Sequence, residues 1–193
     1  MHILRQQLWP ALALTLFLTL ITGVLFPAAV TVVAQVAFPA QANGSLITLD
    51  GGRVVGSSLI GQRFSAPGYF WGRPSAAGAD GYDANASGGS NLGPTNADLI
   101  ERISADAEQL RALHGEPRVP VDLVTTSASG LDPHISPEAA AYQVERVAAA
   151  RGLDADAVRE IVARHTSPPL LGFLGRARVN VLELNLELDG LLP

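Results

Sequence analysis

The strongest constraint on this chain is an N-terminal stretch without charge: no Asp, Glu, Lys or Arg occurs between Arg5 and Asp50. From Leu8 to Phe26, eleven of nineteen residues are Leu, Ile, Phe or Val. Their transfer energies favour membrane insertion of a helix by up to about 5 kcal/mol. Apolar character continues to Val36, which extends the expected helix to about 30 residues, or 45 Å. A bilayer core is about 30 Å thick, so such a helix must tilt, kink or protrude.

We interpret residues 1–40 as a transmembrane anchor and residues 41–193 as a separate domain. Pro27 removes a backbone donor inside the apolar run and is the expected kink. The alternative is a cleaved signal peptide, with Arg5 as its positive region and residues 40–42 as its cleavage site. The apolar run of a signal peptide is about 7 to 15 residues, half the length found here or less, so the anchor is favoured.

The flanking charges predict the orientation of this anchor. Arg5 and the N-terminal amine precede the apolar run, whereas the other flank has no charge before Asp50. Positive charge favours the cytoplasmic side of a membrane. We therefore expect the N-terminus in the cytoplasm and the domain in the periplasm or outside the cell.

The composition of the remaining chain excludes several classes of function. From Asp50 onward there are 12 basic and 18 acidic residues without a basic cluster, and the net charge of the chain is −5, which argues against binding to nucleic acid. There is no Lys and no Cys, which excludes a Walker A loop, a Schiff-base lysine, a thiolate metal site and a disulfide. The four His show no metal-ligand spacing, so no metal site is predicted.

Local patterns after the anchor predict a small α+β domain. Residues 46–49 and 53–55 flank an Asp-Gly-Gly turn, which is typical of a β-hairpin. Three helices are predicted, because Asn96, Ser136 and Asp154 are good N-caps before segments with helical apolar spacing. The expected ends of the first two helices are marked by Gly115 and Gly152.

Two further segments predict strands in this domain. Residues 119–125, with Pro120 near their start, fit a short strand. In residues 182–188, Leu alternates with polar side chains, which is typical of a half-buried terminal strand. Residues 56–93 are rich in Gly, Pro, Ser and Asn, and we expect ordered loops with short strands there.

A glycine-rich segment, Ser87–Asn96 (SGGSNLGPTN), leads into the first predicted helix. Free amides at a helix start can bind an anion, and Gly88 and Gly93 have the spacing of a phosphate loop. However, Pro94 occupies the position where such a loop requires Lys. We therefore favour a tight loop held by bonds from Ser and Asn side chains to the backbone.

An aromatic segment places Tyr69, Phe70 and Trp71 close to Arg73. Aromatic residues and Arg are typical anchors of protein interfaces. Burial in the domain core is an equally good explanation, so both interpretations stay open.

A third group of polar residues surrounds the sequence Asp132-Pro133-His134. With Ser127 and Ser129 upstream, this group leaves a tethered Ser hydrolase as a minor alternative. The chain has no GxSxG elbow, which weakens that alternative.

Several blocks of this sequence, in this order, resemble one known family, the C chain of the Kdp-type potassium-transporting ATPase. The resemblance covers nearly the whole chain. Besides the anchor, it is carried by GSSLIGQ at 56–62, GYFWGRPSA at 68–76, SGGSNLGPTN at 87–96, residues 119–125, SGLDPHIS at 129–136 and VNVLELNLELD at 179–189.

The resemblance implies a non-pumping subunit of a bacterial inner-membrane complex that hydrolyses ATP to import K⁺. In that family, a channel-like KdpA chain selects K⁺, a P-type KdpB chain is phosphorylated, and a small KdpF chain is also present. The C chain is implied to support assembly of the complex. It is also proposed to act as a catalytic chaperone that raises the ATP affinity of KdpB.

We therefore expect no catalytic residues and no bound cofactor in the isolated chain, with ATP and K⁺ handled by the complex. A secreted or membrane-tethered binding module is the alternative function. The candidate partner-binding residues are Tyr69, Phe70, Trp71, Arg73, Ser87, Ser90, Asn91, Asn96, Asp132 and His134.

Overall fold

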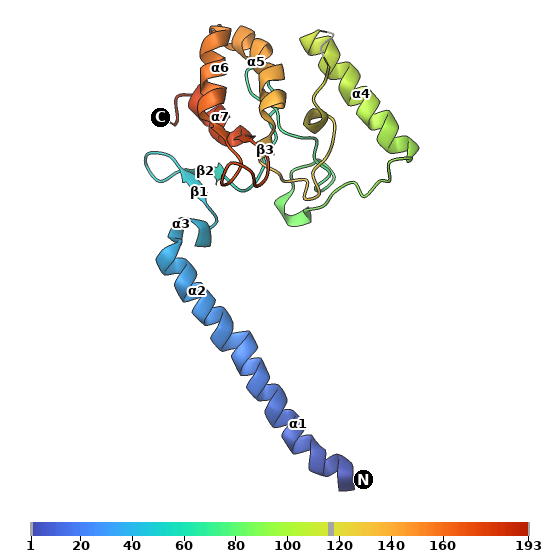
Figure 1. Cartoon of the computed structure of the whole chain (residues 1–193), viewed down its shortest axis with the longest axis vertical. Helices are drawn as coiled ribbons and strands as arrows, with labels where there is room; N and C mark the ends of the chain where they lie inside the picture. Colours follow the sequence, from blue (N-terminus) through green and yellow to red (C-terminus); the bar gives the residue numbers. More distant parts are fainter. Residues whose placement is uncertain (1, 116–117, 193) are drawn as a thin grey trace. The chain divides into compact units, whose positions relative to one another are not determined.

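A computed structural model describes residues 2–115 and 118–192, with side chains from Gln6 onward (Figure 1). The chain divides into two units, Met1–Leu46 and Ile47–Pro193. The division falls six residues beyond the boundary expected from the sequence, after a short helical turn that follows the long helix.

The first unit is a long helix in three successive parts, followed by that turn. Its elements are α1 (His2–Leu20), the π-helical segment η1 (Ile21–Leu25), α2 (Phe26–Ala37) and α3 (Pro39–Ala42). The stretch Gln6–Ala37 has 32 residues, is long and apolar enough to cross a membrane, and buries none of its most apolar window.

The wide π-helical turn η1 ends two residues before Pro27, where the sequence predicts a kink. The ring of a proline in a helix clashes with the carbonyl four residues earlier, which here belongs to Gly23. In η1 the backbone N–H of Phe26 donates to the carbonyl of Ile21, five residues back. This wider turn accommodates the proline ring while the chain stays helical.

The second unit combines helices with two small sheets, as the α+β prediction requires. The hairpin β1–β2 forms where expected, with Gly51 and Gly52 at positive φ. The second sheet is antiparallel with order β3-β5-β4, and Val179 of β5 lies opposite Ile135 and Thr166. The elements are β1 (Leu46–Thr48), β2 (Val54–Ser57), η2 (Ala84–Ala86), α4 (Ala97–His114), η3 (Val121–Leu123), β3 (His134–Ile135), α5 (Pro137–Arg151), α6 (Ala155–Arg164), β4 (Thr166–Ser167), β5 (Arg178–Asn180) and α7 (Val181–Leu188).

The three predicted helices are confirmed as α4, α5 and α6. The side chains of Asn96, Ser136 and Asp154 accept hydrogen bonds from backbone N–H groups of the first turn, as good N-caps do. Gly152 ends α5 in the left-handed conformation, with φ of 66°. Local capping chemistry thus sets the boundaries of these helices.

The prediction of a strand at residues 119–125 is wrong. These residues contain one 3-10 turn, η3, in which the N–H groups of Leu123 and Val124 donate to the carbonyls of Pro120 and Val121. The hydroxyl of Thr125 also donates to the carbonyl of Val121. Two N–H groups are thus paired within the turn, the carbonyls of Val124 and Thr125 accept from Arg102 and Arg73, and this segment has no place in either sheet.

The prediction of a terminal strand at residues 182–188 is also wrong, because this segment is helix α7. The side chain of Asn180 caps it by accepting from the N–H groups of Leu182 and Glu183. Leu182, Leu184 and Leu186 are all buried, so α7 is covered on more than one face and its helical period is hidden in the sequence. The strand lies immediately before it, at β5.

The expected short strands between residues 56 and 93 are absent beyond the end of β2. Residues 58–93, all described by the structure, form loops and the 3-10 turn η2. These loops run between α4 and the helices α5–α7 (Figure 1). One loop residue, Phe70, joins the core, whose other fully buried side chains include Val144, Val147, Val158, Val179 and Leu184.

Candidate partner-binding face

Two buried amide side chains hold the aromatic segment in place. Asn185 of α7 accepts from the backbone N–H of Phe70 at 2.8 Å and donates to its carbonyl at 2.9 Å. Gln143 of α5 does the same for Trp71, with N–O distances of 2.8 and 3.1 Å. Each amide pairs with both the backbone N–H and the backbone carbonyl of one residue, as a neighbouring strand does in a sheet. We call this arrangement the amide clamp.

Two Arg residues of α5 bind the carbonyls just before the amide clamp. Arg146 donates to Pro67 and Tyr69, and its guanidinium lies 4.0 Å from the centre of the Trp71 ring. Burial lowers the pKa of Arg146 to about 10, which leaves it charged at neutral pH. Arg151 donates to Gly68 and is paired with Asp189 at 2.8 Å.

The clamp divides the aromatic residues between core and surface. Phe70 is fully buried, so its side chain belongs to the core and presents no surface to a partner. Tyr69 and Trp71 are partly exposed. Tyr69 donates from its hydroxyl to Asp189, and Trp71 packs against the core while its indole N–H donates to Ala66. Only these two aromatic side chains of the segment reach the surface.

Arg73, Asp132 and His134 come together as one cluster. Arg73 bonds the carbonyls of Thr125 and Thr126, and its Nη1 lies 3.3 Å from Oδ2 of Asp132. Nδ1 of His134 lies 3.5 Å from Oδ1 of the same carboxylate. The bond from the His134 side chain is the main cause that lowers the pKa of Asp132, opposed by partial burial and assisted by the backbone N–H of His134 and by Arg73.

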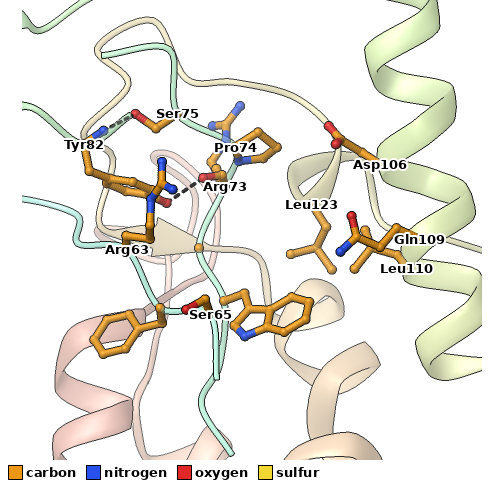
Figure 2. A pocket seen from close by; sticks show the side chains of 13 residues that line it. Arg63, Ser65, Arg73, Pro74, Ser75, Tyr82, Asp106, Gln109, Leu110 and Leu123 are labelled. Atoms are coloured by element: carbon orange, nitrogen blue, oxygen red, sulfur yellow. Dashed lines mark hydrogen bonds between the residues drawn. The ribbon is translucent and has the colours of Figure 1, made fainter. Parts of the chain in front are cut away.

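A cavity of about 400 Å³ lies between this segment and α4 (Figure 2). In Figure 2, Asp106 and Gln109 come from α4, whereas Arg63, Arg73 and Tyr82 come from the loops. The hydroxyl of Tyr82 donates to the carbonyl of Arg73 at 2.5 Å, and burial raises its pKa. Tyr82 therefore stays protonated and supports the loop that carries Arg73.

The glycine-rich segment forms the tight loop that the sequence favours. The hydroxyl of Ser87 and the N–H of Gly88 both donate to the carbonyl of Ser129, at 3.0 and 2.9 Å. Asn91 is exposed at φ of 54°, a conformation that Asn tolerates. Ser90 beside it is half-buried.

Asn96 differs from the other candidates of this loop because its side chain has a structural role. Its Oδ1 accepts from the N–H groups of Asp98 and Leu99 as the cap of α4. These amides would be the donors of an anion site, and the Asn96 side chain occupies them.

The geometry gives the Ser hydrolase alternative no support. The hydroxyls of Ser127 and Ser129 lie 3.4 Å from each other, and within the described residues no hydrogen bond joins either of them to His134. Across residues 2–115 and 118–192 there is also no group of three or more His, Asp or Glu placed to hold a metal ion.

The sequence interpretation missed the residues that build this face. Gln143 and Asn185 are buried amides, and Arg146 and Arg151 supply the charged contacts to the backbone. One signal was available: Asn185 interrupts an apolar Leu pattern at a position that turns out to be 1% exposed. The partner amide, Gln143, lies in an Ala-rich helix where nothing in the local pattern marks it.

We predict that Gln143→Leu destabilises the domain by about 2–5 kcal/mol, because it leaves the buried N–H and carbonyl of Trp71 without partners. Urea unfolding of the full chain in detergent, followed by Trp71 fluorescence in a Trp9→Phe background, measures this loss. Gln109→Leu, at an exposed position of α4, is the matched control and is expected to change little. Equal stability of the two variants would contradict the clamp.

We also predict an acid-sensitive contribution from Asp132. Its lowered pKa means that the carboxylate stabilises the fold above its ordinary pKa of 3.8, and that this stability is lost as the pH falls below that value. Asp132→Asn is expected to lower stability at neutral pH and to flatten its decline in acid. Unfolding midpoints measured across the acid range test this prediction, with Asp80→Asn, at an exposed position, as the control. If the midpoint of Asp132→Asn falls with pH as steeply as that of the parent chain, the prediction is wrong.

Comparison with known proteins agrees with the resemblance seen in the sequence. The family described as "KdpC: K+-transporting ATPase, c chain" matches residues 8–190. The "Potassium-transporting ATPase KdpC subunit" of Polaromonas naphthalenivorans is 59% identical over 192 residues, 98% of this chain and 97% of the relative. The protein of that name from Gemmatimonas aurantiaca is 60% identical over 189 residues, 97% and 94% of the two chains. That from Geobacter sulfurreducens is 52% identical over 188 residues, 97% and 100%. Because the family match covers residues 8–190 and these relatives are 52–60% identical over nearly the whole chain, the chain belongs to the KdpC family of potassium-transporting ATPase subunits.

Proposed function

We propose that this chain is a non-pumping accessory subunit that assembles and stabilises an ATP-driven potassium uptake complex. Its partners are a K⁺-selective KdpA-like chain, a P-type KdpB-like chain and a small KdpF-like chain. The observation that carries the proposal is the exposed 32-residue apolar helix, joined in one chain to a domain that shows no metal cluster among its described residues.

The apolar helix acts as the membrane anchor in this proposal. Every side chain of Gln6–Val33 lies exposed on it, which is stable only against lipid or an apolar partner. Arg5 and the N-terminal amine favour a cytoplasmic N-terminus. The domain then lies in the periplasm or outside the cell, and the complex lies in the bacterial inner membrane.

The second contact is a docking face on the domain. It consists of Tyr69, Trp71, the Arg73–Asp132–His134 cluster and the Ser87–Asn91 loop, and we place it against the outer surface of the KdpA-like chain. The clamp and the bonds to Ser129 hold these groups in one arrangement before binding. A preformed face loses little conformational entropy on association.

We propose that ATP and K⁺ are handled by the partner chains. This chain has no Lys, its glycine-rich loop ends in a capped helix, and the outward orientation separates the domain from cytosolic ATP. The catalytic-chaperone role implied by the resemblance then acts indirectly. A docked domain raises the ATP affinity of the KdpB-like chain by favouring one conformation of the whole complex.

Deletion of residues 1–40 is expected to abolish co-purification of this chain with the KdpA-like chain, because the contact within the bilayer is lost. Affinity purification of a tagged complex measures the recovery of each subunit. Intact-mass analysis of the parent chain provides the control for a secreted module, which would begin near residue 42. Full recovery of the truncated chain would refute the docking role of the anchor.

The docking face is tested by a bulky charge at an exposed position. Asn91→Arg is expected to reduce recovery of the KdpA-like chain several-fold, while the melting temperature of the domain falls by a few degrees at most, because Arg fits the left-handed backbone less well than Asn. Asn91→Gly is the matched control, since Gly keeps the left-handed backbone and adds no bulk. If Asn91→Arg assembles as well as Asn91→Gly, this loop lies outside the interface.

A further inference from the structure

The turn between β4 and β5 carries four large apolar side chains into solvent. Their exposed fractions are 67% for Leu170, 76% for Leu171, 74% for Phe173 and 49% for Leu174. We call residues 168–178, which include the first residue of β5, the apolar turn. Its last residues, 176–178, line a cavity together with Arg73, Asp132 and His134 of the docking face, whereas its apolar tip lies outside that cavity. The sequence interpretation did not single this turn out.

The apolar turn has a defined backbone conformation. The N–H of Leu174 donates to the carbonyl of Leu170 and the reverse bond also forms, with both N–O distances at 2.9 Å. Gly172 donates to Pro169 at 3.0 Å, and Leu171 holds a φ of 55°. Leu171 is not β-branched, but a left-handed conformation is still unfavourable for it. The backbone therefore holds these side chains outward at a local cost.

The apolar turn itself carries only positive charge. No Asp or Glu occurs between Ile161 and Leu182, whereas Arg176 and Arg178 follow the apolar tip. Across the described residues, neither Arg forms an ion pair. The turn thus combines an apolar tip with two cations that form no ion pair, and Asp122 and Asp132 line the same cavity as both of them.

The covalent structure keeps the domain near a membrane if the anchor is inserted. Eight residues separate the end of α2 at Ala37 from the start of β1 at Leu46. Such a connection spans at most about 30 Å. A tethered surface of this kind meets the bilayer at a high effective concentration, so even a weak affinity is sufficient for binding.

We propose that the apolar turn binds the surface of an anionic phospholipid bilayer. Leu171 and Phe173 enter the interface between headgroups and acyl chains, and Arg176 and Arg178 pair with lipid phosphates. An apolar tip backed by Arg is typical of segments that lie at membrane interfaces. Leu is under-represented among the hot spots of protein interfaces, so three Leu in one turn favour lipid over a protein partner.

This inference rests on the proposed insertion of the anchor, and the experiment separates the two. Because the chain has no Cys, single-Cys variants of the full chain can be labelled at one site each. Phe173→Cys probes the turn, and Leu113→Cys, 48% exposed on α4, is the matched control. Both carry an environment-sensitive fluorophore in nanodiscs of phosphatidylcholine with phosphatidylglycerol.

The label at position 173 is expected to shift its emission to the blue and to be quenched several-fold more by doxyl-labelled lipid than the label at 113. Iodide in solution is expected to quench the two in the opposite order. The double variant Arg176→Gln with Arg178→Gln is expected to reduce the protection of the label at 173 from iodide in these anionic nanodiscs. In nanodiscs of pure phosphatidylcholine, the double variant is expected to leave this protection unchanged.

Equal quenching at 173 and 113 would overturn the inference. Protection at 173 that arises only after the KdpA-like chain is added would also overturn it, in favour of a protein partner. Alkaline-carbonate extraction of cell membranes reports on the anchor independently. A chain that is extracted refutes the anchor, whereas a retained chain with an unprotected label at 173 refutes only the lipid contact.

Discussion

The domain depends on the amide clamp. In it, the buried side chains of Gln143 and Asn185 pair with the backbone N–H and carbonyl of Trp71 and of Phe70, respectively. Phe70 can enter the core only if the peptide groups around it are paired, because an unpaired buried N–H or carbonyl costs about 1–3 kcal/mol. A neighbouring strand normally supplies such pairing. Here side chains from α5 and α7 supply it, so a segment without secondary structure crosses the core.

This arrangement explains how a domain rich in loops has a defined surface. The backbone at Phe70 and Trp71 is held from below, and Arg146 and Arg151 bind the carbonyls before it. Arg73 follows two residues after Trp71. It pairs with the carboxylate of Asp132 and donates to the carbonyls of Thr125 and Thr126. The proposed docking face is therefore an extension of the core packing, and a core defect is expected to alter it.

Capping and turn chemistry account for the parts of the fold that were predicted correctly. Asn96, Ser136 and Asp154 act on backbone groups two or three residues away, so their effect is visible in a short window of sequence. The candidate residues for the docking face, which stay a prediction, were proposed for a similar reason. Tyr69, Trp71, Arg73, Asp132 and His134 lie in two short segments of unusual composition, although only the fold shows which of them are near one another.

The sequence by itself determined the long apolar helix, the hairpin and three capped helices, since each depends on local propensity and charge. Tertiary structure alone decided that Leu182–Leu188 is a helix, because burial on several faces removes the periodicity by which a helix is recognised. It also decided that Phe70 is core while its neighbours are surface. That outcome depends on Gln143 and Asn185, which lie about 70 and 115 residues further along the chain, and no local pattern contains a contact of such long range.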